Sequence, residues 1–304
     1  MVRRGLPILR TIALPLLLAL AGFAAPAQTP APHVSLVPLN PPQNTIYIAS
    51  GSTGSNNGVI IGDTGVILVD TGVSTAAEQL ELDEIAKITS KPVTAAIITH
   101  SDADHVTGLA VLPAGATIIA QENCKTEMEA AANPPQRGPG PRPQIPLPTK
   151  TIDTKGAMTI DGVRFEFLHV APAHTSGDLM IYLPDEKTVF TGDIIADNTP
   201  YPIIHMEKNG SSEGWIESVT ELVKFDADQF VPGHGAVHTK AEIEQRLASV
   251  KERRAEIQSL VAQGKTLDEI KQQLGETPQP AAGGRGPRFP SFTDVVYQEL
   301  TKKN

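Results

Sequence analysis

Two histidines and two aspartates stand within six residues, from His100 to His105, in the order His-Ser-Asp-Ala-Asp-His. They directly follow the apolar run Val93–Ile98, which predicts a buried strand. Alternate side chains of an extended segment point to the same face, so we expect His100 and Asp102 to lie together. Imidazole and carboxylate groups in this pattern are typical ligands of first-row divalent metals. The competing interpretation is a strand-to-helix turn in which Asp102 or Asp104 caps the helix.

Three further polar residues follow predicted strands in the second half of the chain. His174 lies in a loop between two strands, Asp193 ends a third strand, and His234 follows a fourth and is flanked by glycines. Each residue alone is an ordinary turn residue. Together with the segment 100–105 they place ligand-type side chains on four loops that leave strands. This pattern predicts that the four loops meet at one site.

The elements that must position these loops alternate between strands and helices, which predicts an α/β fold. The proline-rich run 133–148 cannot form a helix or an inner strand, so it predicts an exposed flap or linker. Thr239 and Glu242 have the spacing of a capping box and predict the start of a long helix. Apolar patterns predict strands at 45–49, 59–62, 66–70, 93–98, 117–120, 158–160, 163–168, 179–183 and 188–191, with helices at 80–88, 105–112, 122–132, 215–225, 239–264, 267–274 and near 295–300.

Taken in order, the motifs His-x-Asp-x-Asp-His, Pro-Ala-His-Thr-x-Gly-Asp, Thr-Gly-Asp and Val-Pro-Gly-His-Gly resemble the metallo-β-lactamase fold superfamily. The resemblance runs from about Thr45 to His234 and implies a four-layer αββα sandwich with the site at one edge of two packed sheets. It also implies two divalent metal ions. The implied ligands are His100, Asp102 and His174 for the first ion, Asp104, His105 and His234 for the second, and a bridging Asp193, as in the glyoxalase II-like branch.

Asp102 departs from the family pattern, which usually has a histidine at this position. Flavodiiron proteins, which share the fold, have a carboxylate there. Three carboxylates around two divalent ions leave a net charge of +1, against +2 for the histidine version. A lower charge makes a bound water less acidic and favours oxygen-preferring metals. Zinc is the first expectation, with iron or manganese as alternatives.

The resemblance implies a metal-dependent hydrolase, in which a metal-activated water attacks an ester, thioester, lactone, amide or β-lactam bond of a small molecule. Asp104 is the predicted catalytic residue, as a metal ligand that also orients the water. The alternative is a non-hydrolytic protein on the same fold, either a diiron-type redox protein or a metal-binding module, and Asp102 is the residue that favours it.

The N-terminal segment indicates where the protein is located, and the composition limits the kinds of partner that it binds. Residues 1–27 combine early arginines, a short apolar centre and a small-residue cleavage site, which predicts a secretory signal peptide and a secreted or periplasmic protein with no membrane span in the mature chain. A net charge of −9 argues against a nucleic-acid partner. The oligomeric state is not predicted. The predicted domains are the signal peptide 1–27, a proline-rich leader 28–44 without regular structure through Pro42, a metallo-β-lactamase-like domain 45–238, and a helical extension 239–304 packed on that domain.

For several other polar residues we expect a structural role or leave two roles open. Asp70 ends a predicted strand and is either a partner of a metal-bound histidine or a helix cap. Cys124 is the only cysteine, and we expect it to pack rather than react. We expect structural or ligand-supporting roles for His169 and His205, solvated loop charges for Arg137 and Arg142, and no role for His33 and His238.

Overall fold

The computed structural model describes residues 1, 31–132, 144–197, 199–276 and 289–302. The predicted signal peptide and residues 133–143 of the predicted flap, with Arg137 and Arg142, lie outside the described residues. Among the helices that are described, none has the length and apolar character needed to cross a membrane.

The first half of the chain forms a seven-stranded sheet whose strands follow one another in sequence order. Neighbouring strands are antiparallel from β1 to β4 and parallel from β4 to β7. The parallel part needs crossover helices, and the predicted helices supply them. The strands are β1 Val34–Pro38, β2 Ile46–Gly51, β3 Asn57–Ile61, β4 Val66–Val69, β5 Val93–Ile97, β6 Thr117–Gln121 and β7 Lys150–Ile152.

The second half forms a five-stranded sheet in the order β12-β11-β10-β9-β8. Its strands are antiparallel except for the pair β11 and β12, which is parallel and is connected through helix α4. The strands are β8 Lys155–Ile160, β9 Val163–Leu168, β10 Met180–Leu183, β11 Thr188–Ala196 and β12 Gln229–His234.

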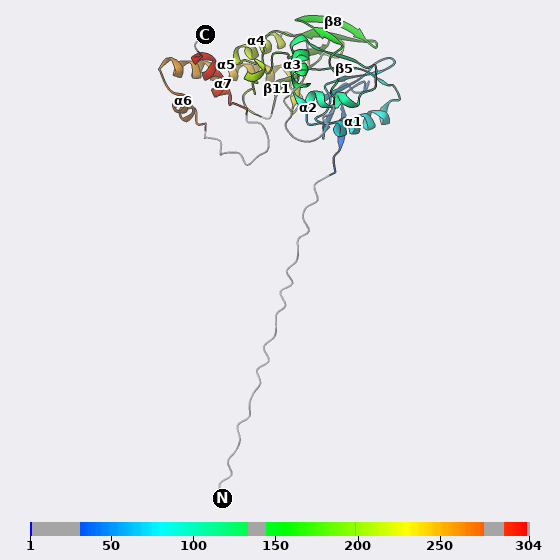
Figure 1. Cartoon of the computed structure of the whole chain (residues 1–304), viewed down its shortest axis with the longest axis horizontal. Coiled ribbons are helices and arrows are strands. Elements are labelled where there is room, and N and C mark those ends of the chain that lie inside the picture. Colours follow the sequence, from blue (N-terminus) through cyan, green and yellow to red (C-terminus); the bar gives the residue numbers. More distant parts are fainter. Residues whose placement is uncertain (2–30, 133–143, 198, 277–288, 303–304) are drawn as a thin grey trace. The chain divides into compact units, whose positions relative to one another are not determined.

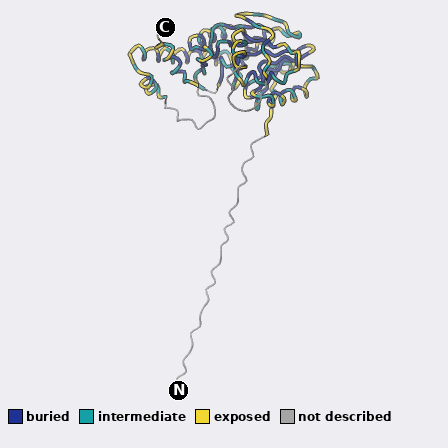
Figure 2. The backbone as a smooth tube through the Cα atoms, viewed as in Figure 1, coloured by how far each residue is buried: buried dark blue, intermediate teal, exposed yellow. Residues whose placement is uncertain are grey.

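Three apolar clusters separate four layers, so the predicted αββα sandwich is confirmed. Alternation along the strands creates these layers. Within β4, Ile67 belongs to the central cluster between the sheets, whereas Leu68 belongs to the outer cluster under the N-terminal helices. Within β10, Ile181 faces the centre and Met180 the C-terminal helices. Figure 2 shows the buried residues gathered inside the part of the fold where Figure 1 draws the two sheets.

The helices cover the outer faces of the two sheets. Helices α5, α6 and α7 gather at the end of the fold away from α1 (Figure 1). The predicted capping box of Thr239 and Glu242 opens α5, and Gly264 follows its end with a φ of +78°. The bounds are α1 Thr75–Ile88, α2 Ala103–Val106, η1 Thr107–Val111, α3 Glu122–Ala132, η2 Met206–Lys208, α4 Ser212–Leu222, α5 Lys240–Ala262, α6 Leu267–Gln273 and α7 Phe292–Thr301.

Two local predictions were wrong. The leader was expected to lack regular structure, but β1 pairs along the whole edge of β2, and Pro38 is tolerated because it ends an edge strand. The predicted apolar face of α1 included Ile88, which is exposed. Glu78 and Glu81 are fully buried instead, because Gly72 and Asn57 supply inward-facing hydrogen-bond donors for their carboxylates.

Candidate metal centre

The four predicted segments meet at one edge of the two sheets, where their ligand-type side chains form three overlapping groups. One of these, His100, His105 and Asp193, connects the other two, which we call the first and the second group. The segment after β5 carries the His-x-Asp-x-Asp-His motif, the loop between β9 and β10 carries His174, and β12 ends on His234. Asp193 was predicted to end its strand. It lies instead inside β11, where the pairing with β12 is irregular on both sides of Gly192. A Cβ atom at Gly233 would stand 1.8 Å from Asp193 Oδ1, so glycine is required there.

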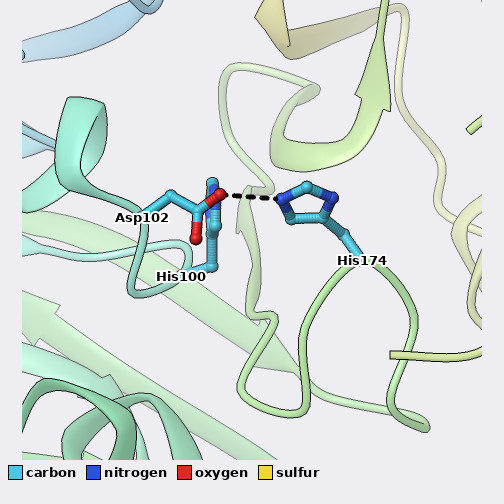
Figure 3. A group of neighbouring side chains, drawn as sticks. All are labelled: His100, Asp102 and His174. Atoms are coloured by element: carbon cyan, nitrogen blue, oxygen red, sulfur yellow. Dashed lines mark hydrogen bonds and ion pairs between the residues drawn. The ribbon is translucent and has the colours of Figure 1, made fainter. Parts of the chain in front are cut away.

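The first group joins His100, Asp102 and His174 (Figure 3). The carboxylate of Asp102 lies beside both rings, with its Oδ2 atom 3.3 Å from His174 Nε2 and 3.7 Å from His100 Nε2. Asp102 is the residue before α2, but its side chain makes no capping hydrogen bond. The capping interpretation of this residue is therefore wrong.

The second group joins Asp104, His105 and His234. Asp104 Oδ2 lies 3.2 Å from His234 Nε2 and 3.9 Å from His105 Nε2. Asp193 lies between the two groups, with Oδ1 3.4 Å from His105 Nε2 and Oδ2 3.9 Å from His174 Nε2. Asp193 is thus within reach of imidazoles from both groups.

Three of the four imidazoles are oriented by an acceptor at Nδ1. His105 Nδ1 lies 2.8 Å from Asp70 Oδ2, and His174 Nδ1 lies 2.8 Å from the carbonyl oxygen of Ile203. His100 Nδ1 lies 3.0 Å from Thr99 Oγ1, whose own proton goes to Asp70 Oδ2. These contacts place a proton on Nδ1, so Nε2 is the atom that faces the centre and would bind an ion.

A model of the metallo-beta-lactamase superfamily matches residues 51–234. The chain belongs to the metallo-beta-lactamase superfamily. As a member of this superfamily it is also similar to a metallo-beta-lactamase from Pontibacter korlensis, with a TM-score of 0.60 and 19% sequence identity over 72% of this chain and 99% of that one. At this identity the likeness shows the fold alone.

Two curated bacterial enzymes are similar to parts of this metallo-beta-lactamase superfamily member. The alpha subunit of 2,4-dinitroanisole O-demethylase from Nocardioides sp. (strain JS1661) is 28% identical over 145 residues, which are 47% of this chain and 41% of the relative. A linear primary-alkylsulfatase from Pseudomonas sp. (strain ATCC 19151) is 26% identical over an alignment of 195 positions that covers 51% of this chain and 36% of the relative. The matched segments therefore span less than half of either relative.

Orphaned buried atoms test whether the centre fits the metals that this superfamily binds. His100 Nε2, His105 Nε2 and Asp193 Oδ1 are buried and have no hydrogen-bond partner among the described residues. Buried polar atoms are normally paired, and an unpaired one costs about 1–3 kcal/mol. Three unpaired ligand atoms that face one another fit a divalent cation. The donor set of nitrogen and oxygen atoms suits zinc, iron or manganese.

The electrostatics of the first group also favour a cation. Although burial raises the pKa of the Asp102 carboxyl, the neighbouring imidazoles of His100 and His174 lower it far below its usual range. Burial lowers the pKa of His174, but the hydrogen bond to Asp102 and the charge of Asp193 outweigh it and raise the pKa to about 9. The group thus stabilises positive charge at the centre.

The electrostatics of the second group also favour a cation. Burial opposes the charged form of His105, yet the carboxylates of Asp70 and Asp193 hold its pKa well above the usual range. Hydrogen bonds to Asp104 and Asp193 raise the pKa of His234 to about 10. Burial raises the pKa of Asp193, but the charge of His105 and the nearby imidazole of His234 hold it well below its usual range. Bound metal ions would supply this positive charge without protons.

Several residues outside the motifs take clear positions. Asp70 supports His105 rather than capping α1, whose cap is Ser74. His169 is structural, with Nδ1 2.8 Å from the carbonyl oxygen of Asp178. Cys124 is fully buried, which raises the pKa of its thiol and agrees with a packing role.

Sequence reasoning missed one charged residue at the centre. Lys208 Nζ forms an ion pair with Asp102 Oδ1. His205 lies beside the same carboxylate, with Nε2 3.3 Å from Asp102 Oδ2, so it supports the site. Lys208 has no sequence signal of its own, because it is 106 residues from Asp102 and stands in a polar turn.

Proposed function

We propose that this protein is a secreted or periplasmic metal-dependent hydrolase that acts on a small molecule. One observation carries the proposal: four distant loops bring seven ligand-type side chains together, with buried nitrogen and oxygen atoms left unpaired. Such centres cleave ester, thioester, lactone, amide or β-lactam bonds. The family to which the chain belongs includes metallo-beta-lactamases with this fold.

Divalent ions at the centre would polarise a carbonyl oxygen and lower the pKa of water. His100, His105 and His174 have side chains 2% exposed or less and serve to hold the ions. Asp104 and His234 have side chains 32% and 21% exposed, so the second group faces solvent. We assign Asp104 a double role, as a ligand and as the carboxylate that accepts a hydrogen bond from water and orients it.

A sulfate ester is the second substrate class that we consider. Its support is the similarity to a linear primary-alkylsulfatase, and the O-demethylase relative adds an aryl ether bond to the substrates worth testing. A diiron-type redox protein or a binding module is the proposal from another class. It rests on Asp102, because a carboxylate at this position favours metals that prefer oxygen ligands.

Metal analysis combined with a substrate panel tests the proposal. The panel contains a cephalosporin reporter, thioesters, lactones, phosphodiesters, alkyl sulfates and an aryl methyl ether. We expect purified protein to hold zinc or manganese in stoichiometric amount and to turn over at least one of these substrates. Iron with an oxygen-sensitive spectrum would favour redox chemistry, and intact metal without any turnover would favour a binding module.

His105→Ala is the decisive variant for hydrolysis. It removes a fully buried ligand and should abolish turnover and metal at the second group. His238→Ala is the matched control, because His238 lies outside the three groups and pairs with Asp197 at 2.9 Å. Full hydrolysis by His105→Ala would overturn the proposal.

A further inference from the structure

Lys208 brings a positive charge to the first group of the metal centre. Its Nζ atom pairs with Asp102 Oδ1 and donates to Ser101 Oγ at 2.8 Å. The lysine stands at the end of η2, in the segment between β11 and α4. Its side chain is 25% exposed, so the ion pair is partly shielded from solvent.

The contact with Lys208 gives the two oxygen atoms of Asp102 different partners. Lys208 holds Oδ1, while Oδ2 faces His174 and His205 at 3.3 Å each and His100 at 3.7 Å. With Oδ1 engaged, one oxygen atom remains for an ion between the two histidines. An ammonium group also offsets a negative charge that a histidine at this position would not carry.

The contacts continue from Lys208 to a second loop of the site. Ser101 Oγ donates to Glu127 Oε2. Glu127 Oε1 accepts from the backbone nitrogen of Ser176 at 3.2 Å and from its hydroxyl at 2.6 Å. We call Lys208, Ser101, Glu127 and Ser176 the lysine clamp. It connects the segment that carries Asp102 with the loop that carries His174.

Backbone contacts fix the position of the lysine relative to His174. The nitrogen of His205 donates to the carbonyl oxygen of His174 at 2.8 Å, and His174 Nδ1 lies 2.8 Å from the carbonyl oxygen of Ile203. A Cβ atom at Gly210 would stand 2.4 Å from the same carbonyl oxygen of His174, so the turn after Lys208 approaches this loop closely. The lysine and His174 are thus positioned together.

We propose that Lys208 is a positioning residue of the first metal group, which holds Asp102 through Oδ1 and makes a carboxylate a competent ligand where the family usually has histidine. This inference rests on the proposed function, because it requires that the centre binds metal. Residues that orient metal ligands typically contribute about 10–100-fold to metal affinity.

Zinc titration against a chromophoric chelator tests the lysine, with Zn²⁺ alone as the probe. In Lys208→Met we expect one of two binding events to weaken about 10–100-fold and the other to stay unchanged. Lys208→Arg keeps the charge and should lose less. Lys187→Met is the matched control, because Lys187 pairs with Asp226 away from the centre.

The same lysine substitution made in an Asp102→His variant separates an effect on the position of Asp102 from an effect on folding. In Asp102→His the imidazole needs no counter-charge, so adding Lys208→Met should change zinc affinity less than about threefold. An equal loss in both backgrounds, or no loss from Lys208→Met alone, would overturn the inference. Wild-type protein that binds no zinc would contradict the proposed function instead. Near-UV circular dichroism checks that each variant is folded.

Discussion

The two halves of the candidate metal centre are supported by opposite charges. In the first half the carboxylate of Asp102 pairs with the ammonium of Lys208. In the second half the imidazole of His105 pairs with the carboxylate of Asp70, and its side chain is fully buried. The halves should therefore respond differently when a supporting residue is removed. Asp193 lies between them, near imidazoles of both.

Asp193→Ala should have the largest effect, because Asp193 lies within 3.9 Å of imidazoles from both halves. We expect both zinc ions to be lost at micromolar free zinc and turnover to fall below detection. Chelator competition and the substrate panel measure this. Two tightly bound ions in this variant would show that the halves are independent sites.

Asp70→Asn should affect the second half more than the first, because Asp70 contacts His105 directly and His100 only through Thr99. An amide oxygen can accept from the Thr99 nitrogen, but the NH2 group then replaces the acceptor of the His105 Nδ1 proton, so one zinc affinity should fall about 10–100-fold. The zinc-binding event that Lys208→Met weakens should fall less. Asp226→Asn, at an exposed ion pair, is the control. Equal weakening of both zinc-binding events would contradict the difference between the two halves.

Glu78→Gln should alter stability and leave the metal sites intact. Burial raises the pKa of Glu78 from 4.5 to about 7, against the hydrogen bond from Gly72. A raised pKa means that the folded state binds the proton more tightly. The resulting stabilisation is complete below pH 4.5 and is lost as the pH rises to about 7.

At 1.36 kcal/mol per pKa unit, the part of this loss that comes from Glu78 is about 3 kcal/mol, and Glu78→Gln should remove that part. Buried Glu81, whose pKa is also raised, should keep a smaller pH dependence of the same sign in the variant. Urea unfolding at pH 5 and pH 8 measures the difference. Glu84→Gln, on the same helix and ion-paired with Lys87, is the matched control. The same pH dependence in Glu78→Gln and wild type would contradict the assignment.

Most of the fold follows from local patterns in the sequence. Alternating apolar residues specify both faces of strands such as β4, because each face packs against a different layer. The start of α5 follows from the capping box of Thr239 and Glu242. The edge strand β1 could not be predicted, because its stability comes from pairing with β2 rather than from its own residues.

The candidate ligands could be predicted because their motifs are compact and follow strands. Their supporting residues could not. Lys208 and Glu127 occupy polar positions of a turn and a helix, where solvated charges are the usual outcome. Glu78 and Glu81 are charged residues that a helical pattern places outside, and only their distant donors explain why they are buried. Long-range polar contacts leave no periodic trace in the sequence.

The number of metal ions bound by the wild-type chain tests the central claim most directly. Native mass spectrometry with elemental analysis, after chelation and reloading with zinc, gives this number. We expect two ions per chain, one for each half of the centre. A chain that stays folded but binds none at saturating zinc, or only one, would contradict a two-ion centre built from these residues.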